Sequence, residues 1–182
     1  MRRLNRMELA FCRQVAGMVE PGGWVLDAPC GSGRFFEILS PAGLIAMLDL
    51  NPAMLETLRN NYGRNGALSL VQGDVGVLPF ADDSFELCFC MRLFHHIGDD
   101  GLRRQMLGEL SRVSRRYVAL SFYKTSSWRY IRRAIRGKKP SGRSVSTGKF
   151  VSTAADAGLR LMQKVPQLSV VEQQQMLLFE KA

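Results

Sequence analysis

The stretch VLDAPCGSGRF, residues 25–35, decides the fold of this chain. It opens on apolar residues that predict a buried strand, and the strand ends at the carboxylate of Asp27. A turn with Gly31 and Gly33 follows at once. Glycines there let the backbone approach a ligand closely and leave the N–H groups of the next helix free to bond it. We therefore expect a ligand loop at the end of the first strand.

Short apolar runs alternate with helix-period segments along the rest of the chain. The runs lie at 24–29, 44–50, 67–72, 85–91 and 117–123. Two more strands are expected near 159–165 and 175–181, the last at a sheet edge or inserted antiparallel. This alternation predicts an α/β, Rossmann-like, doubly wound fold, with a mostly parallel seven-stranded sheet and helices on both faces.

Helix signals lie between these runs. An amphipathic helix is expected over 3–19 and a short helix over 35–40. Asn51 has the residue type of an N-cap for a third helix. Its expected buried stripe is Met54, Leu55 and Leu58. Asp99 or Asp100 is expected to cap the next helix. The buried face of that helix would hold Leu102, Met106, Leu110 and Val113.

The composition limits the class of protein. With 182 residues, 46% of them hydrophobic, the whole chain 1–182 fits one globular domain. The four cysteines show no zinc-type or extracellular pattern, so we expect no metal site and a reducing, cytoplasmic compartment. No window approaches the roughly 18 apolar residues of a membrane span, and the basic N-terminus lacks the apolar stretch of a signal peptide.

The chain is basic, with 25 Lys and Arg against 16 Asp and Glu and a formal net charge of +9. Such a charge attracts polyanions or anionic surfaces. We expect a basic insertion at about 125–149, because residues 128–149 hold eight basic and no acidic residues. Helical spacing would place one set of residues on one face and another set opposite: Arg129, Arg132, Arg133 and Arg136 against Trp128, Ile131 and Ile135. This arrangement suits peripheral contact of residues 128–143 with an anionic membrane surface. The alternative is a solvated arm packed on the sheet.

The loops after the first four strands hold the candidate binding residues, because ligands of open α/β sheets lie beyond the carboxyl ends of the strands. Asp27 ends the first strand. Asp49 follows 22 residues later, where a carboxylate can accept both hydroxyls of a ribose. Asp74 follows the third strand in a Gly-Asp turn, and residues 91–96 follow the fourth.

Each of these residues also has a structural explanation. The glycines fit an ordinary strand-to-helix connection, Asp49 a helix cap and Asp74 a simple turn. Cys88 and Cys90 share one face of a strand and are expected in the core. Cys30, in the loop, is expected to be a small packing residue that is more exposed to a ligand. The ordered set, rather than any one residue, indicates a ligand site.

This ordered set resembles the class I S-adenosylmethionine-dependent methyltransferases, in particular the small-molecule branch that includes quinone-biosynthesis-type enzymes. The resemblance covers about residues 20–122. VLDAPCGSG matches the family pattern D-x-G-x-G-x-G, with Pro29 in place of the first glycine. Residues 78–97, LPFADDSFELCFCMRLFHHI, are similar to the family segment that runs through strand four into a helix with paired histidines. There Glu86 replaces the usual aspartate.

The resemblance implies S-adenosyl-L-methionine as the cofactor. Asp27 and the glycine loop would face its methionine end, Asp49 the ribose, and Asp74 with Val75 the adenine. The implied cofactor-binding residues are Asp27, Ala28, Pro29, Cys30, Gly31, Gly33, Asp49, Leu50, Asp74, Val75, Met91 and Arg92.

The implied reaction transfers a methyl group to a small-molecule or lipid-like acceptor. The protein then has chiefly to bring a nucleophile in line with the methyl carbon and to exclude water. An acceptor that must lose a proton needs a base, for which His95, His96, Tyr123 and Tyr130 are candidates. The histidines also fit packing or capping roles, so the sequence assigns no catalytic base.

Other function classes fit less well. A nicotinamide oxidoreductase wants a third glycine where Phe36 stands, and the patterns of P-loop enzymes and α/β-hydrolases are absent from the sequence. An RNA methyltransferase is the first alternative, because of the positive charge, although the D/N-P-P-Y/F segment of adenine-N6 enzymes is replaced by residues 91–94. A non-catalytic binding protein with a cofactor fold is the second.

Overall fold

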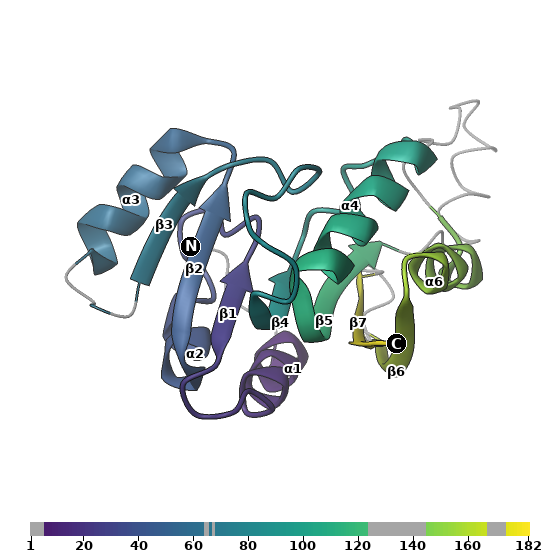
Figure 1. Cartoon of the computed structure of the whole chain (residues 1–182), viewed down its shortest axis with the longest axis horizontal. Coiled ribbons are helices and arrows are strands. Elements are labelled where there is room, and N and C mark those ends of the chain that lie inside the picture. The colour runs from purple at the N-terminus through teal and green to yellow at the C-terminus, as the bar shows by residue number, and fades with distance from the viewer. Residues whose placement is uncertain (1–5, 64–65, 67, 124–144, 167–173) are drawn as a thin grey trace.

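A computed structural model describes residues 6–63, 66, 68–123, 145–166 and 174–182. These residues form a seven-stranded sheet in the order β3-β2-β1-β4-β5-β7-β6 (Figure 1). The strands are β1 (Trp24–Asp27), β2 (Leu44–Asp49), β3 (Leu68–Gln72), β4 (Phe85–Cys90), β5 (Ser114–Tyr123), β6 (Leu159–Pro166) and β7 (Gln174–Lys181).

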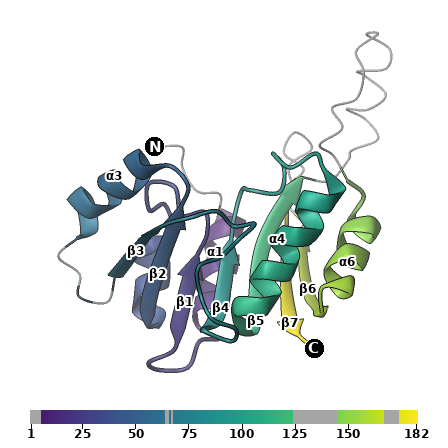
Figure 2. The ribbon, with the colours of Figure 1, turned by 45° about the horizontal axis from the view of Figure 1, so that its top comes forward.

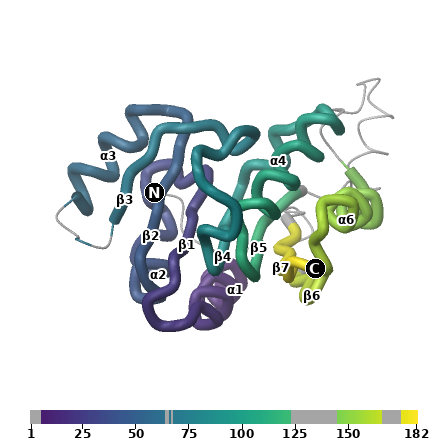
Figure 3. Tube along the Cα trace, viewed as in Figure 1, coloured from purple at the N-terminus to yellow at the C-terminus, as the bar shows by residue number. Residues whose placement is uncertain are grey.

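The first five strands pair in parallel, and β7 is inserted antiparallel between β5 and β6. The predicted mostly parallel seven-stranded sheet is therefore confirmed, and so is the antiparallel insertion of the last strand. Figure 3 follows the chain from β1, in the middle, out to β3 and back across to β4. The direction of winding thus reverses between β1 and β4, which is where ligands bind in open α/β sheets.

Helices cover both faces of the sheet (Figure 2). They are α1 (Arg6–Ala16), α2 (Phe36–Leu39), the 3-10 helix η1 (Ser40–Ala42), α3 (Pro52–Tyr62), α4 (Asp100–Val113) and α6 (Thr147–Asp156). Residues of α1, α2 and α3 share one apolar cluster on the sheet. Residues of α4 and α6 share the other. The doubly wound arrangement expected from the sequence is confirmed.

The predicted helix caps are present. Asn51 Oδ1 accepts a hydrogen bond of 3.0 Å from the N–H of Ala53 at the start of α3. Asp99, rather than Asp100, caps α4, because its Oδ1 accepts from the N–H of Leu102 at 2.6 Å. These side chains satisfy backbone donors that a helix leaves without partners at its first turn.

Two of the predicted buried residues are exposed instead. Met54 and Leu102 keep 36% and 37% of their surface in contact with solvent, while the other predicted residues of both stripes are buried. Both lie in the first turn of their helix, where the next residue along the chain, Leu55 or Arg103, is buried instead. The first turn of each helix therefore packs inward on a side one residue away from Met54 or Leu102.

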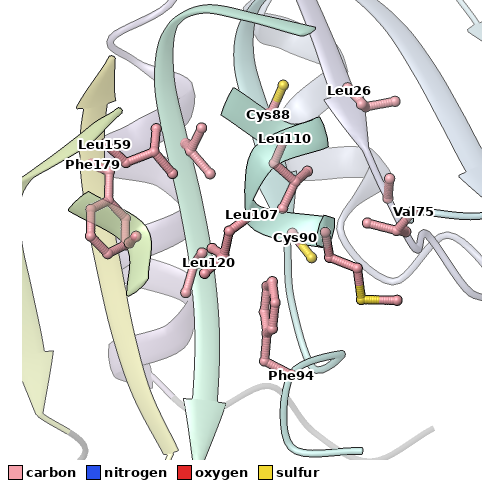
Figure 4. Close-up of a cluster of buried hydrophobic side chains, with 14 of the residues drawn as sticks. Leu26, Val75, Cys88, Cys90, Phe94, Leu107, Leu110, Leu120, Leu159 and Phe179 are labelled. Carbon is pink, nitrogen blue, oxygen red and sulfur yellow. The ribbon is translucent and has the colours of Figure 1, made fainter. Parts of the chain in front are cut away.

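Cys88 and Cys90 lie in the apolar cluster beneath α4, as predicted (Figure 4). Both are fully buried, and burial is the main cause that raises the pKa of each thiol. Small apolar side chains on this face of β4 let α4 pack closely on the sheet.

The basic segment falls mostly outside the described residues. Of the expected insertion 125–149, the structure describes only 145–149, so the predicted membrane-facing stretch 128–143 and Tyr130 lie outside it. Within the described part of the chain, no helix has the length and apolar content needed to cross a bilayer.

Candidate functional site

The ends of β1 and β2 are joined through the glycine loop. Ala28 N–H donates to the carbonyl of Phe89 on β4, and Cys30 N–H donates to the carbonyl of Leu48 on β2, each at 2.9 Å. The peptide bond between Ala28 and Pro29, where the family has its first glycine, is cis. The loop therefore lies across the carboxyl ends of three adjacent strands.

Gly31 and Gly33 both adopt a left-handed backbone, with φ of +54° and +81°, but for different reasons. A Cβ at Gly33 would overlap the side chain of Leu58 on α3, so packing requires glycine there. A Cβ at Gly31 would meet nothing within 4 Å. The backbone at Gly31 thus borders open space, as a loop that receives a ligand requires.

Asp49 is held in place by two backbone donors. Its Oδ2 accepts from the N–H of Gly31 at 2.8 Å and its Oδ1 from the N–H of Asn51 at 2.9 Å. A carboxylate has about four acceptor positions, so about two remain for hydroxyl groups of a ligand. The role of Asp49 as a helix cap, which the sequence left open, belongs to Asn51 instead.

Asp27 is a fully buried carboxylate. Neither of its oxygens has a hydrogen-bond partner among the described residues. Burial, and then the negative charge of Asp49, raise the pKa of Asp27 well above its usual range. A buried carboxylate without a partner lowers stability, so its presence points to a ligand group that completes it.

Asp74 forms the turn after β3. Its Oδ1 accepts from the N–H of Gly76 at 2.8 Å, so the simple turn role holds. The preceding residue, Gly73, donates its N–H to the carbonyl of Asp49 at 3.2 Å, which places this turn beside the end of β2. The side chain of Val75 packs in the core (Figure 4), whereas Leu50 is 64% exposed at the same edge.

Cys30 is a packing residue, as predicted, and it is buried. It keeps only 4% of its surface in contact with solvent and lies in the apolar cluster with Phe35 and Met91. Burial, followed by the charges of Asp27 and Asp49, raises the pKa of its thiol. Cys88 and Cys90 have no exposed surface, so Cys30 is the most exposed of the three, and its contact with a ligand stays a prediction.

The histidines lie in a loop, not in a helix. Residues 91–99 are irregular and α4 begins at Asp100, as the predicted cap at Asp99 or Asp100 requires, so only the helix that the resemblance implied for the histidines is absent. The rings of His95 and His96 lie 3.8 Å apart between centroids. Burial, then the charges of His96 and Arg92, lower the pKa of His95 to about 4. His95 is therefore neutral at pH 7.

The sequence also singled out Tyr123 and Glu86, which lie at opposite ends of their strands. Tyr123 ends β5 and pairs with Gln174, and its side chain lies outside the described part of the structure. Glu86 lies near the start of β4, 3.7 Å from Arg116, at the edge opposite the glycine loop. Its substitution for the family's aspartate does not touch the candidate site.

Met91 and Arg92 follow β4 at the same edge as the glycine loop. Met91 is buried, and Arg92 has a left-handed backbone with φ of +63° although it is not glycine. The guanidinium of Arg92 donates to both carboxylate oxygens of Glu8 on α1, at 3.0 and 2.7 Å. Sequence reasoning missed Glu8, although its spacing to Phe11 and Val15 places this acid on the buried stripe of α1.

Residues 25–116, half of the chain, match the family described as "methyltransferase domain", and the chain belongs to that family. The family resemblance seen in the sequence is therefore confirmed.

The chain is similar in sequence to the ubiquinone/menaquinone biosynthesis C-methyltransferase UbiE of Hahella chejuensis. It is 30% identical over 134 residues, which cover 68% of this chain and 52% of the relative. UbiE of Ectopseudomonas mendocina is 33% identical over 113 residues, which cover 57% of this chain and 43% of the relative. The chain thus spans about half the length of the curated relatives it matches.

Solved structures share the fold. Magnesium protoporphyrin IX methyltransferase of Synechocystis PCC 6803, solved with bound SAH, superposes with a TM-score of 0.79 at 15% sequence identity. The superposition covers all of this chain and 90% of that structure. The N-methyltransferase NodS of Bradyrhizobium japonicum has a TM-score of 0.75 at 14% identity, with coverages of 97% and 95%. These likenesses confirm the Rossmann-like methyltransferase fold.

Proposed function

We propose that the chain binds S-adenosylmethionine at the carboxyl edge of β1 to β4 and transfers its methyl group to a small molecule of quinone-like or lipid-like character. The family assignment supports the reaction class, and the UbiE relatives support the acceptor class. The observation that carries the proposal is the buried Asp27 carboxylate, which has no partner among the described residues. It ends β1 just before the loop in which the backbone of Gly31 borders open space and binds Asp49.

The residues present fit this cofactor. The α-ammonium group of a methionine moiety would form an ion pair with the Asp27 carboxylate, because a cationic donor offsets the cost of burying that charge. Asp49 has acceptor positions left for the ribose hydroxyls. The turn at Asp74 and Val75 lies next to Asp49 on the side where an adenine would follow the ribose. When bound, the cofactor supplies a methyl group activated on a sulfonium.

The chain's own contribution is binding, orientation and exclusion of water. Two of the acids proposed to face the cofactor are buried at the sheet edge, so their charges act in a medium of low polarity. No metal is proposed, since methyl transfer from a sulfonium to a positioned nucleophile does not require one.

We propose His95 as a hydrogen-bonding group towards the acceptor rather than as a strong base. A pKa of about 4 keeps its ring neutral at pH 7 and makes it a weak proton acceptor. His96 and Tyr123 remain candidates for the same task. An acceptor that ionises readily, such as a phenol, needs no stronger base.

Calorimetric titration with S-adenosylhomocysteine, the demethylated product, tests the cofactor site. The unaltered chain is expected to bind, and Asp49→Ala to raise the Kd on the order of 100-fold, because charged hydrogen bonds to two hydroxyls are lost. Asp156→Ala, which removes an exposed acid at the end of α6, is the control and is expected to bind normally. Absence of binding by the unaltered chain would remove the basis of the proposal.

The acceptor class is tested with methyl-labelled cofactor and fractionated extracts of small molecules, lipids and RNA. Label in a quinone or lipid fraction supports the proposal. Label in RNA favours the alternative of an RNA methyltransferase, and cofactor binding without any labelled acceptor favours a non-catalytic binding protein. A single domain with a basic insertion at 125–149 and a cytoplasmic location stay predictions of the sequence.

We also propose, from the sequence, peripheral contact of residues 128–143 with anionic membranes. Residues 124–144 hold eight Lys and Arg and no acid, out of a net charge of +9 for the whole chain. Sedimentation with phosphatidylglycerol vesicles is expected to pull down the chain at low salt and to release it as salt rises. Binding that is absent, or indifferent to salt, argues against this contact.

A further inference from the structure

We propose that Glu8 is a positioning residue of the candidate site, and that its ion pair with Arg92 holds the loop after β4 in the shape that binds the cofactor. The inference rests on the proposed function. It gives a role to the first turn of α1, which the family match over 25–116 does not include.

The ion pair has the geometry of a strong interaction. Arg92 Nε lies 3.0 Å from Glu8 Oε1, and Arg92 Nη2 lies 2.7 Å from Glu8 Oε2, so the guanidinium meets the carboxylate with two parallel bonds. Glu8 is 1% exposed, whereas the Arg92 side chain is 32% exposed. A carboxylate this deeply buried needs its cation, because removal of one partner leaves an uncompensated charge.

Arg92 is also constrained through its backbone. Its φ of +63° is a conformation that residues other than glycine seldom adopt and that persists only where the surroundings enforce it. Its N–H donates to Oγ of Ser121, a fully buried residue of β5, at 2.9 Å. One residue therefore joins α1, the end of β4 and β5.

This junction lies at the same edge of the sheet as the end of β1. Asp27 pairs with Phe89 across β1 and β4, and Arg92 follows Phe89 by three residues. Cys12, one helical turn after Glu8, is buried in the same apolar cluster as Met91. The loop held by Arg92 therefore begins beside the strand that ends at Asp27.

Two acids at this edge thus differ in how they are satisfied. Arg92 neutralises Glu8, while Asp27 has no partner among the described residues. Glu8 therefore fixes the guanidinium of Arg92 and, through it, the loop that carries Met91.

The test compares Glu8→Gln and Arg92→Gln, singly and together, with Glu20→Gln as the matched control. Glu20 forms an ion pair with Arg116 at 3.5 Å, but both side chains are exposed. Two quantities are measured on the whole chain: the Kd for S-adenosylhomocysteine, and hydrogen exchange of residues 6–16 and 91–99 without ligand. Arg92→Lys serves as a second variant that keeps the positive charge if Arg92→Gln does not fold.

We expect Glu8→Gln to raise the Kd at least about tenfold and to speed exchange in both segments, with Glu20→Gln unchanged. The double variant is expected to bind better than the product of the single effects, because it leaves no buried charge without a partner. Unchanged affinity in Glu8→Gln, or reduced affinity with unchanged exchange in 91–99, overturns the inference alone. Absence of binding by the unaltered chain overturns the proposed function, and this inference with it.

Discussion

Replacement of Asp27 by asparagine is expected to make the ligand-free chain more stable and its cofactor binding weaker. Asp27 is fully buried and neither of its oxygens has a partner among the described residues. A buried polar group without a partner costs about 1–3 kcal/mol, and a charged one costs more than a neutral amide of the same shape. The asparagine amide still lacks a partner, so only the extra cost of the charge is removed, and the Asp27→Asn variant is expected to gain about 1 kcal/mol at pH 8.

A chain of this length changes its Tm by about 2–4 °C for each kcal/mol, so the variant is expected to melt about 2–4 °C higher. The gain depends on pH. Burial and the charge of Asp49 raise the pKa of Asp27 in the folded state above the value of about 3.9 in the unfolded chain. The folded chain then keeps a proton that the unfolded chain releases, and the resulting stability is lost as pH rises through the folded pKa.

Thermal and urea unfolding from pH 5 to pH 9 measure this effect, with Asp156→Asn as the control on an exposed acid. The difference in stability between Asp27→Asn and the unaltered chain is expected to grow with pH. Titration with S-adenosylhomocysteine is expected to show a loss of about tenfold or more, because a charge-assisted hydrogen bond is weakened. A variant that is less stable than the unaltered chain at pH 8, or that binds the ligand equally well, refutes the reasoning.

Other substitutions test separate parts of the structure. Gly33→Ala is expected to lower the free energy of unfolding by about 2 kcal/mol or more, because its Cβ would overlap α3. Gly31→Ala is expected to lower it by about 1–2 kcal/mol through its left-handed backbone alone, yet to weaken S-adenosylhomocysteine binding more than Gly33→Ala. Melting curves and calorimetric titrations of both variants measure the two effects, and a Gly31→Ala variant that binds as well as Gly33→Ala contradicts the prediction. Arg112→Ala is expected to lose about 1–2 kcal/mol in urea unfolding, because its guanidinium joins two acids and two backbone carbonyls, and exposed Arg104→Ala should lose nothing. The His95 ring is expected to titrate near pH 4 when followed by NMR, and titration near 6.5 contradicts this. Because the unfolded chain takes up this proton at a higher pH than the folded chain, the contribution of His95 to stability is present above pH 6.5 and is lost as pH falls towards 4. The four buried cysteines are expected to resist alkylation at pH 8 in the native chain and to react after unfolding; rapid native alkylation contradicts their burial.

Periodicity and turn chemistry predicted the fold well. The strands are apolar and bounded by turn signals or helix-period segments, so they could be assigned from local pattern. Asn51 and Asp99 were recognisable because capping depends on residues two or three positions away. The spacing of Asp27, Gly31 and Asp49 predicted a common edge, since parallel strands of one sheet present their carboxyl ends together.

Periodicity failed where it does not fix which side of a first helical turn packs inward. Met54 and Leu102 follow the helical pattern of their stripes but are exposed, while Leu55 and Arg103 beside them are buried. The family resemblance implied a helix over His95 and His96, yet residues 91–99 form a loop before the Asp99 cap. Neither pattern fixes the length of that loop or the orientation of the first helical turn.

The sequence by itself therefore determined the order of strands and helices, the caps and the set of acids at one sheet edge, because these depend on neighbours along the chain. Only the tertiary structure decided which acids are satisfied: Asp49 by Gly31, Glu8 by Arg92 across 84 positions, and Asp27 by no described residue. The physical reason is that burial and charge pairing depend on segments distant in sequence, which no local pattern encodes.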